Sequence, residues 1–132
     1  MNILLCEDDP NIATIARLAL EQIGHHKVTW VADGEAAKTS ATSGAFDVIL
    51  LDEMMPKKSG ADVCTELRTS GAPTAPIIFL SANPQMARVE EFRPLTVGYI
   101  SKPFDPIQLC AQIDGILNDH ALANGATKQK VG

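Results

Sequence analysis

The chain has 132 residues, a size typical of one domain with a single hydrophobic core. Hydrophobic residues make up 45% of it, and the net charge of −5 argues against a nucleic-acid-binding surface, which needs a basic stripe. No apolar run is long enough to cross a bilayer, and the N-terminal residues lack the basic flank of a signal peptide. We therefore expect a cytoplasmic protein with no membrane insertion.

Three cysteines lie far apart and without the spacing of metal ligands, at Cys6, Cys64 and Cys110. An odd number of cysteines without a framework predicts buried, reduced thiols in a reducing compartment. His25 and His26 lie together in a predicted turn, and we expect them to be exposed.

The first half of the chain predicts two strands and two helices. Residues 2–6 form the first strand, and Asp9-Pro10 then caps a helix that ends at Gly24. The apolar stripe expected on this helix is Ile12, Ile15, Ala16, Ala19, Leu20 and Ile23. A second strand at 28–31 carries Trp30 as a core residue, and an alanine-rich helix follows from Asp33-Gly34 to about residue 43.

The second half continues the same alternation. The third strand is Asp47 to Leu51, and Ser59 to Asp62 resembles a capping box before the third helix. A fourth strand at 76–80, which places Phe79 in the core, precedes a short helix that starts at Asn83-Pro84 and must end before Pro94. Two further elements are expected, a fifth strand at 97–100 and a last helix that begins at Asp105-Pro106.

Strands that alternate with helices at short spacing predict an α/β fold with a parallel sheet covered on both faces. The strands are continuous apolar runs, as a sheet buried on both sides requires. We predict five parallel strands in one domain over residues 1–118, followed by a flexible tail at 119–132. The order 2-1-3-4-5 is one that a doubly wound sheet of five strands can have.

Polar residues follow several of these strands. Glu7 and Asp8 follow the first, Asp52 the third, Ser81 the fourth and Lys102 the fifth. In the order 2-1-3-4-5 the first and third strands are neighbours, so their three carboxylates would share one crevice at the carboxyl ends of the strands. Clustered carboxylates need a cation among them, and Mg²⁺ is the natural hard cation for oxygen ligands. A carboxylate beside a metal, a lysine and a hydroxyl can accept a phosphoryl group.

The chain resembles the receiver domains of two-component response regulators from residue 1 to about 118. The motifs that carry the resemblance are Ile3-Leu4-Leu5-Cys6-Glu7-Asp8, Asp52 with Met55-Pro56 and Gly60, Ser81-Ala82, and Tyr99-Ile100-Ser101-Lys102-Pro103-Phe104. Their order and spacing are specific to that family, and the resemblance implies a flavodoxin-like fold with the strand order 2-1-3-4-5.

The resemblance implies a role for each of these residues. Asp52 would be the phosphoacceptor, and Mg²⁺ would be bound by Asp8, Asp52 and the backbone carbonyl of Met54, with Glu7 acting mainly through water. Ser81 and Lys102 would contact the phosphoryl group, and Tyr99 with Ser81 would form a switch. The phosphoryl donor would be a sensor histidine kinase or a phosphotransfer protein. Output would pass through the face made by the fourth helix, fifth strand and fifth helix. The Lys102–Pro103 peptide is commonly cis in the family.

The sequence also departs from the family pattern. The stretch from Ser81 to Lys102 is slightly short, and Arg93-Pro94-Leu95-Thr96 replaces the usual small residues before the fifth strand. No effector domain follows, so we expect a stand-alone, chemotaxis-type regulator with a separate, unidentified downstream partner. It would not be an enzyme in its own right, because it would promote only its own phosphorylation and dephosphorylation.

Several alternatives remain open. The chain could be a phosphorelay intermediate, a phosphate sink, or an adaptor whose output does not depend on phosphorylation. A metal-dependent aspartyl phosphatase would need a second acid two residues after Asp52, where Met54 stands. A flavin carrier would need a Gly/Ser/Thr-rich loop instead of Glu7-Asp8-Asp9. Lys57-Lys58 reads as a solvated loop that could also steer an acidic partner.

Overall fold

The computed structural model describes residues 1–71, 75–83 and 88–123. They contain a five-stranded sheet whose neighbouring strands all pair in parallel, in the order β2-β1-β3-β4-β5, which confirms the predicted fold and strand order. The strands are β1 (Asn2–Cys6), β2 (Lys27–Val31), β3 (Val48–Asp52), β4 (Ile77–Ser81) and β5 (Thr96–Ser101).

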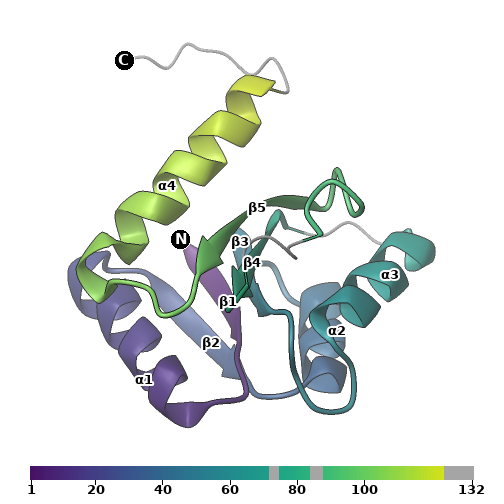
Figure 1. Ribbon diagram of the computed structural model, residues 1–132, viewed down its shortest axis with the longest axis horizontal. Helices are drawn as coiled ribbons and strands as arrows, with labels where there is room; N and C mark the ends of the chain where they lie inside the picture. Colours follow the sequence, from purple (N-terminus) through teal and green to yellow (C-terminus); the bar gives the residue numbers. More distant parts are fainter. Residues whose placement is uncertain (72–74, 84–87, 124–132) are drawn as a thin grey trace.

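The helices cover both faces of the sheet (Figure 1). They are α1 (Pro10–Leu18), its π-helical continuation η1 (Ala19–Ile23), α2 (Gly34–Ser43), α3 (Gly60–Ser70) and α4 (Pro106–Ala123). The predicted caps at Asp9 and Ser59 are confirmed, because each side chain accepts a hydrogen bond from a backbone N–H of the first helical turn, and Asp33 caps α2 in the same way. Ser59 and Asp62 form the predicted capping box.

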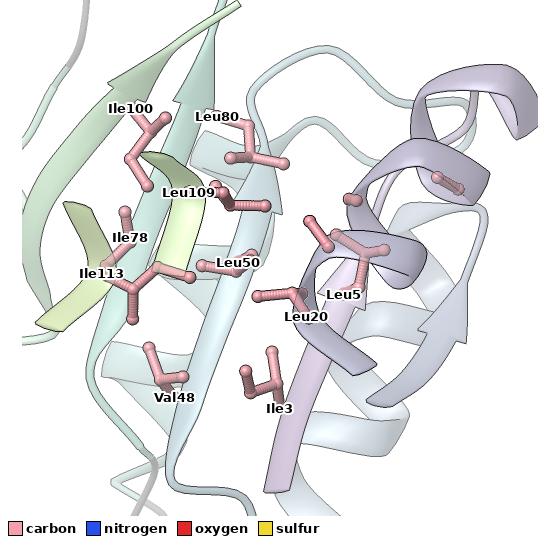
Figure 2. Close-up of a cluster of buried hydrophobic side chains, with 13 residues drawn as sticks. Ile3, Leu5, Leu20, Val48, Leu50, Ile78, Leu80, Ile100, Leu109 and Ile113 are labelled. Carbon is pink, nitrogen blue, oxygen red and sulfur yellow. The ribbon is translucent and has the colours of Figure 1, made fainter. Parts of the chain in front are cut away.

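The central strands are buried on both faces, and the core is divided into two halves. One half lies between the sheet and α1, η1 and α4, where side chains such as Leu5, Leu50 and Ile113 meet (Figure 2). The other half lies between the sheet and α2 and α3, around Ile49 and Phe79. All residues of β3 and β4 are buried, so the strands present hydrocarbon to both layers and polar groups only at their ends.

The buried side of the first helix differs from the predicted stripe. Ala13 and Ala16 face the sheet, whereas Ile15 is 45% and Ile23 is 51% exposed. Small residues allow α1 to lie close to the sheet, which leaves the larger isoleucines at the margin of the contact. The π-helical hydrogen bond from Gly24 N to Ala19 O then changes the helical phase, so a uniform 3.6-residue period is the wrong template here.

The prediction that Trp30 is a core residue is also wrong. Its side chain is 38% exposed because β2 is an edge strand of the sheet. Phe79, on the internal strand β4, is fully buried as predicted.

The described residues just before β5 are not helical. The predicted helix start at Asn83-Pro84 falls partly on residues outside those described, and residues 89–95 form turns. Their hydrogen bonds run from Phe92 N to Val89 O and from Thr96 N to Phe92 O. Pro94 has no N–H to continue a helix, and Phe92 instead anchors the turns by packing edge-on against Phe79 in the core.

The last helix continues beyond the predicted boundary at residue 118, because the described residues Pro106–Ala123 are helical. The sequence from Asn118 to Ala123 contains no glycine or proline and includes the good helix formers Ala121 and Leu122, so the polar composition was a misleading signal. The rest of the predicted tail, 124–132, lies outside the described residues. Among the described helices, none is long and apolar enough to span a membrane.

The predicted burial of the cysteines is confirmed for Cys6 and Cys64, whereas Cys110 is only half-buried. His25 is exposed as predicted. His26 is half-buried, and its Nδ1 lies 3.2 Å from the N-terminal nitrogen of Met1.

Candidate functional site

The loop after β1 places one buried and one exposed carboxylate at the edge of the sheet. Glu7 is fully buried, and its backbone is held on both sides: Glu7 N donates to Val31 O at 3.1 Å, and the Trp30 indole Nε1 donates to Glu7 O at 2.8 Å. Its side-chain Oε2 accepts a hydrogen bond from Asp9 N at 3.1 Å. Asp8, the next residue, is exposed toward solvent.

Asp52 is the last residue of β3 and is only 3% exposed. Its Oδ1 accepts a hydrogen bond from Met54 N at 3.2 Å, so the loop that follows the strand orients the carboxylate. Gly60, at the start of α3, lies directly behind this loop. A Cβ at Gly60 would lie 2.7 Å from Asp52 O and 3.0 Å from Glu53 Cα, so only glycine allows this approach.

The three predicted acidic residues converge, and the predicted lysine joins them. Ligand oxygens of Glu7, Asp8 and Asp52 lie within 4.8 Å of one another. Lys102, which follows β5, places its Nζ 3.1 Å from Glu7 Oε1 and 3.2 Å from Asp52 Oδ2. These residues also line one cavity at the carboxyl ends of the strands, together with Asp9, Ala82 and Asn83.

Burial and neighbouring charge change the pKa values of this group. Burial raises the pKa of Asp52 to about 7, and the nearby charge of Glu7 acts in the same direction. The Met54 N–H and the Lys102 ammonium oppose this rise because they stabilise the ionised form. Burial alone would lower the pKa of Lys102, but its hydrogen bond to Glu7 and the charge of Asp52 hold it above the usual value.

The two predicted switch residues occupy different positions. Ser81 is fully buried at the end of β4, where its Oγ accepts a hydrogen bond from Asn83 N at 3.2 Å and its carbonyl accepts one from Lys102 N at 2.8 Å. Tyr99, on β5, is 45% exposed and is not among the residues that line the cavity. The Lys102–Pro103 peptide is cis. The Met54 side chain is 77% exposed and ends in a soft thioether, so only its backbone carbonyl is a candidate ligand for a hard cation.

Trp30, beside the site, and Lys58, in the loop after Asp52, make contacts that the sequence does not predict. Trp30 supports Glu7 from the neighbouring strand, and the only available signal was a tryptophan near the end of the strand paired with β1. Lys58 was interpreted as a solvated loop residue, but its side chain is 21% exposed and forms ion pairs with Glu35 and Glu66.

The donor set fits a hard divalent cation. Two buried carboxylates and one exposed carboxylate offer oxygen ligands at one point, and the single ammonium of Lys102 does not balance three negative charges. Mg²⁺ prefers oxygen ligands and retains several waters, which suits a site that is open on the side of Asp8.

The sequence matches the response regulator receiver domain over residues 3–114. The chain belongs to this family. Membership of this family implies the phosphoacceptor role of two-component signalling, and receiver domains bind Mg²⁺ at an acidic pocket of this kind.

Among its relatives is the response regulator protein PmrA of Pseudomonas aeruginosa, 37% identical over 114 residues, which are 86% of this chain and 51% of PmrA. The chain spans about half the length of curated relatives such as PmrA and RprY of Bacteroides fragilis.

Two solved structures are also similar. The receiver domain of the sensor histidine kinase PA1611 from P. aeruginosa, described with a magnesium ion in its active site cleft, is 31% identical with a TM-score of 0.76. Vibrio cholerae CheY4 is 26% identical with a TM-score of 0.75. The alignments cover 89% and 87% of this chain, and 97% of each of those structures.

Proposed function

We propose that this receiver accepts a phosphoryl group on Asp52 from a phosphohistidine, in a Mg²⁺-dependent reaction, in the cytoplasm. The donor would be a sensor histidine kinase or a phosphotransfer protein. The observation that carries this proposal is the position of Asp52, buried at the end of β3 among the carboxylates of Glu7 and Asp8 and the ammonium of Lys102. The protein acts on no other substrate and promotes only its own phosphorylation and dephosphorylation.

In this reaction a carboxylate oxygen of Asp52 forms a bond to phosphorus while the bond between phosphorus and the donor's imidazole nitrogen breaks. Asp8, Asp52 and the Met54 carbonyl would hold Mg²⁺, with Glu7 acting through water, and the ion would neutralise charge on the phosphoryl oxygens. Lys102 supplies a second positive charge, 3.2 Å from Asp52 Oδ2. The Met54 N–H holds Asp52 Oδ1, so the nucleophile is oriented before the donor arrives.

An apolar groove beside the acidic cavity is suited to the donor protein. It is lined by Ile12, Ile15, Ala82, Lys102, Pro103 and Phe104. Ile12, Ala82 and Lys102 also line the acidic cavity, so a protein seated in this groove lies next to Asp52. The exposed Ile15 provides apolar area that such a partner would bury.

Output would leave the domain through the turn segment 89–95, β5 and α4. Phosphorylation would move the Ser81 hydroxyl toward the phosphoryl group and Tyr99 from its exposed position inward, which shifts an existing equilibrium. We propose that the chain signals through this face to a separate effector protein, as a single-domain regulator.

One observation favours a second candidate function. Residues 89–95 form turns anchored by Phe92 rather than a regular helix. The output face could therefore have the same conformation with and without phosphorylation. The chain would then be a phosphorylation-independent adaptor. A phosphorelay intermediate or phosphate sink would use the same site as the first proposal but would have no effector.

The chemistry is tested by incubation with Mg²⁺ and acetyl phosphate. A mass gain of one phosphoryl group (about 80 Da) is expected in the wild type and not in Asp52→Asn. No gain in the wild type, or an equal gain in the variant, contradicts the proposal. Partner affinity measured with and without beryllofluoride separates the candidates, because the adaptor binds equally in both conditions.

A further inference from the structure

The loop between β3 and α3 determines how Asp52 is presented. This loop, residues 53–59, supplies the Met54 N–H that binds Asp52 Oδ1 at 3.2 Å. Its outer residues are poorly buried, since the Met54 side chain is 77% and the Lys57 side chain 64% exposed. The Glu53–Met54 peptide is held at its carbonyl, because Glu53 O accepts a hydrogen bond from Gly60 N at 2.9 Å. The exposed residues between Met54 and Gly60 need further anchors to keep this arrangement.

Lys58 provides an anchor to two helices. Its Nζ lies 2.7 Å from Glu66 Oε2 on α3 and 3.1 Å from Glu35 Oε2 on α2. Glu66 Oε1 lies 3.4 Å from Lys38 Nζ on α2, so the four side chains form one network that joins the loop to both helices. Hydrogen bonds to Glu66 and Glu35 raise the pKa of Lys58, and the hydrogen bond from Lys58 lowers the pKa of Glu66.

The backbone beneath Lys58 is packed against the start of α2. Gly34 N donates to Pro56 O at 3.1 Å, and a Cβ at Gly34 would lie 2.2 Å from Lys58 O. The loop thus rests on α2 through its backbone and is tied to α2 and α3 through one side chain. Lys57 differs, because its Nζ lies 3.7 Å from Asp33 and most of its side chain is in solvent.

We propose that Lys58 is a positioning residue for phosphoryl transfer, whose ion pairs with Glu35 and Glu66 act together with the hydrogen bond from Gly60 N to Glu53 O to keep the Met54 peptide next to Asp52. This inference rests on the proposed function. It replaces the interpretation of Lys57-Lys58 as a pair that steers an acidic partner, in which the more exposed Lys57 would matter at least as much.

The test compares Lys58→Met with Lys58→Arg, which keeps the charge, and with Lys57→Met, which removes the same charge one residue away. Three quantities are measured: amide hydrogen exchange of residues 53–60 without metal, Mg²⁺ affinity by calorimetry, and the initial rate of phosphorylation by acetyl phosphate. In Lys58→Met the loop amides should exchange faster, and Mg²⁺ affinity and the rate should each fall about three- to tenfold. Lys58→Arg and Lys57→Met should stay within about twofold of the wild type.

A variant of Glu66, the ion-pair partner of Lys58, separates the loss of the ion pair from misfolding of Lys58→Met. Glu66→Gln leaves Lys58 in place and should reproduce its phenotype, and the double variant should add little to either single one. Unchanged loop exchange in both Lys58→Met and Glu66→Gln overturns the inference, as does an equal loss of rate in Lys57→Met. If the wild type is not phosphorylated, the proposed function fails, while hydrogen exchange and Mg²⁺ affinity still decide the role of Lys58.

Discussion

The ammonium nitrogen of Lys102 lies 3.2 Å from Oδ2 of Asp52 and 3.1 Å from Oε1 of Glu7, at the meeting point of β1, β3 and the loop after β5. Both carboxylates are buried, and the lysine side chain is only 14% exposed. Without a metal, Lys102 is the cation that offsets these two charges. It therefore stabilises the fold as well as preparing the site for an anionic phosphoryl group.

Lys102→Met should lower the free energy of unfolding of the metal-free protein by about 3 kcal/mol, because it leaves two buried carboxylates without their cation. Urea unfolding in EDTA measures this change. Lys102→Arg should retain most of the stability, and Asp52→Asn added to Lys102→Met should recover part of the loss. Equal stability of Lys102→Met and the wild type would show that the ion pairs do not matter for folding.

Asp52 should make the stability of the metal-free protein depend on pH. Its pKa in the folded protein is raised to about 7 from an ordinary value of 3.8, so the folded state binds more protons than the unfolded state between these values. The contribution of Asp52 to the free energy of unfolding therefore falls as pH rises from about 4 to about 7.

Asp52→Asn removes this contribution, so its melting temperature relative to the wild type should increase with pH across that window and level off above it. Thermal melts in EDTA from pH 5 to pH 8 test this. Parallel profiles for the two proteins would contradict it. Mg²⁺ should also stabilise the wild type more at pH 8 than at pH 5, because the ligands must be ionised to bind it.

One rule predicts the strands and the residues at their carboxyl ends, and the strand order that the resemblance implies then brings Glu7, Asp8, Asp52 and Lys102 together. Continuous apolar runs form internal parallel strands, and whatever follows each run is brought to the same edge of the sheet. This rule needs no knowledge of side-chain packing. It places β3 and β4 within one residue of their observed bounds.

The features that escaped prediction depend on packing between distant segments. Ile15 has the correct helical spacing for burial but is exposed, because alanines make the close contact of α1 with the sheet. Phe92 is drawn into the core by Phe79, so turns replace helical hydrogen bonds before β5. The sequence predicts that Lys58 is a solvated loop residue, but the packing of α2 and α3 places Glu35 and Glu66 next to it.

Substitution by alanine should change the stability of the protein in opposite directions at two glycines. Gly60→Ala places a Cβ 2.7 Å from Asp52 O and should cost about 1–3 kcal/mol of stability through overpacking. A Cβ at Gly115, in α4, would meet no heavy atom of another segment within 4 Å, so Gly115→Ala should stabilise the protein by about 1 kcal/mol through helix propensity. Urea unfolding of both variants measures the contrast. Phosphorylation should also slow in Gly60→Ala and stay unchanged in Gly115→Ala.

Trp30 links the edge strand β2 to the acidic loop through the hydrogen bond from its Nε1 to Glu7 O. Trp30→Phe keeps an aromatic ring on β2 but removes the donor, and should lower the free energy of unfolding by about 1 kcal/mol. Because Glu7 and Asp8 are adjacent, the same change should weaken Mg²⁺ binding by a few-fold. Urea unfolding followed by circular dichroism and calorimetric Mg²⁺ titration measure the two effects. If stability falls while Mg²⁺ affinity is unchanged, Trp30 supports the fold alone and does not set the position of the metal ligands.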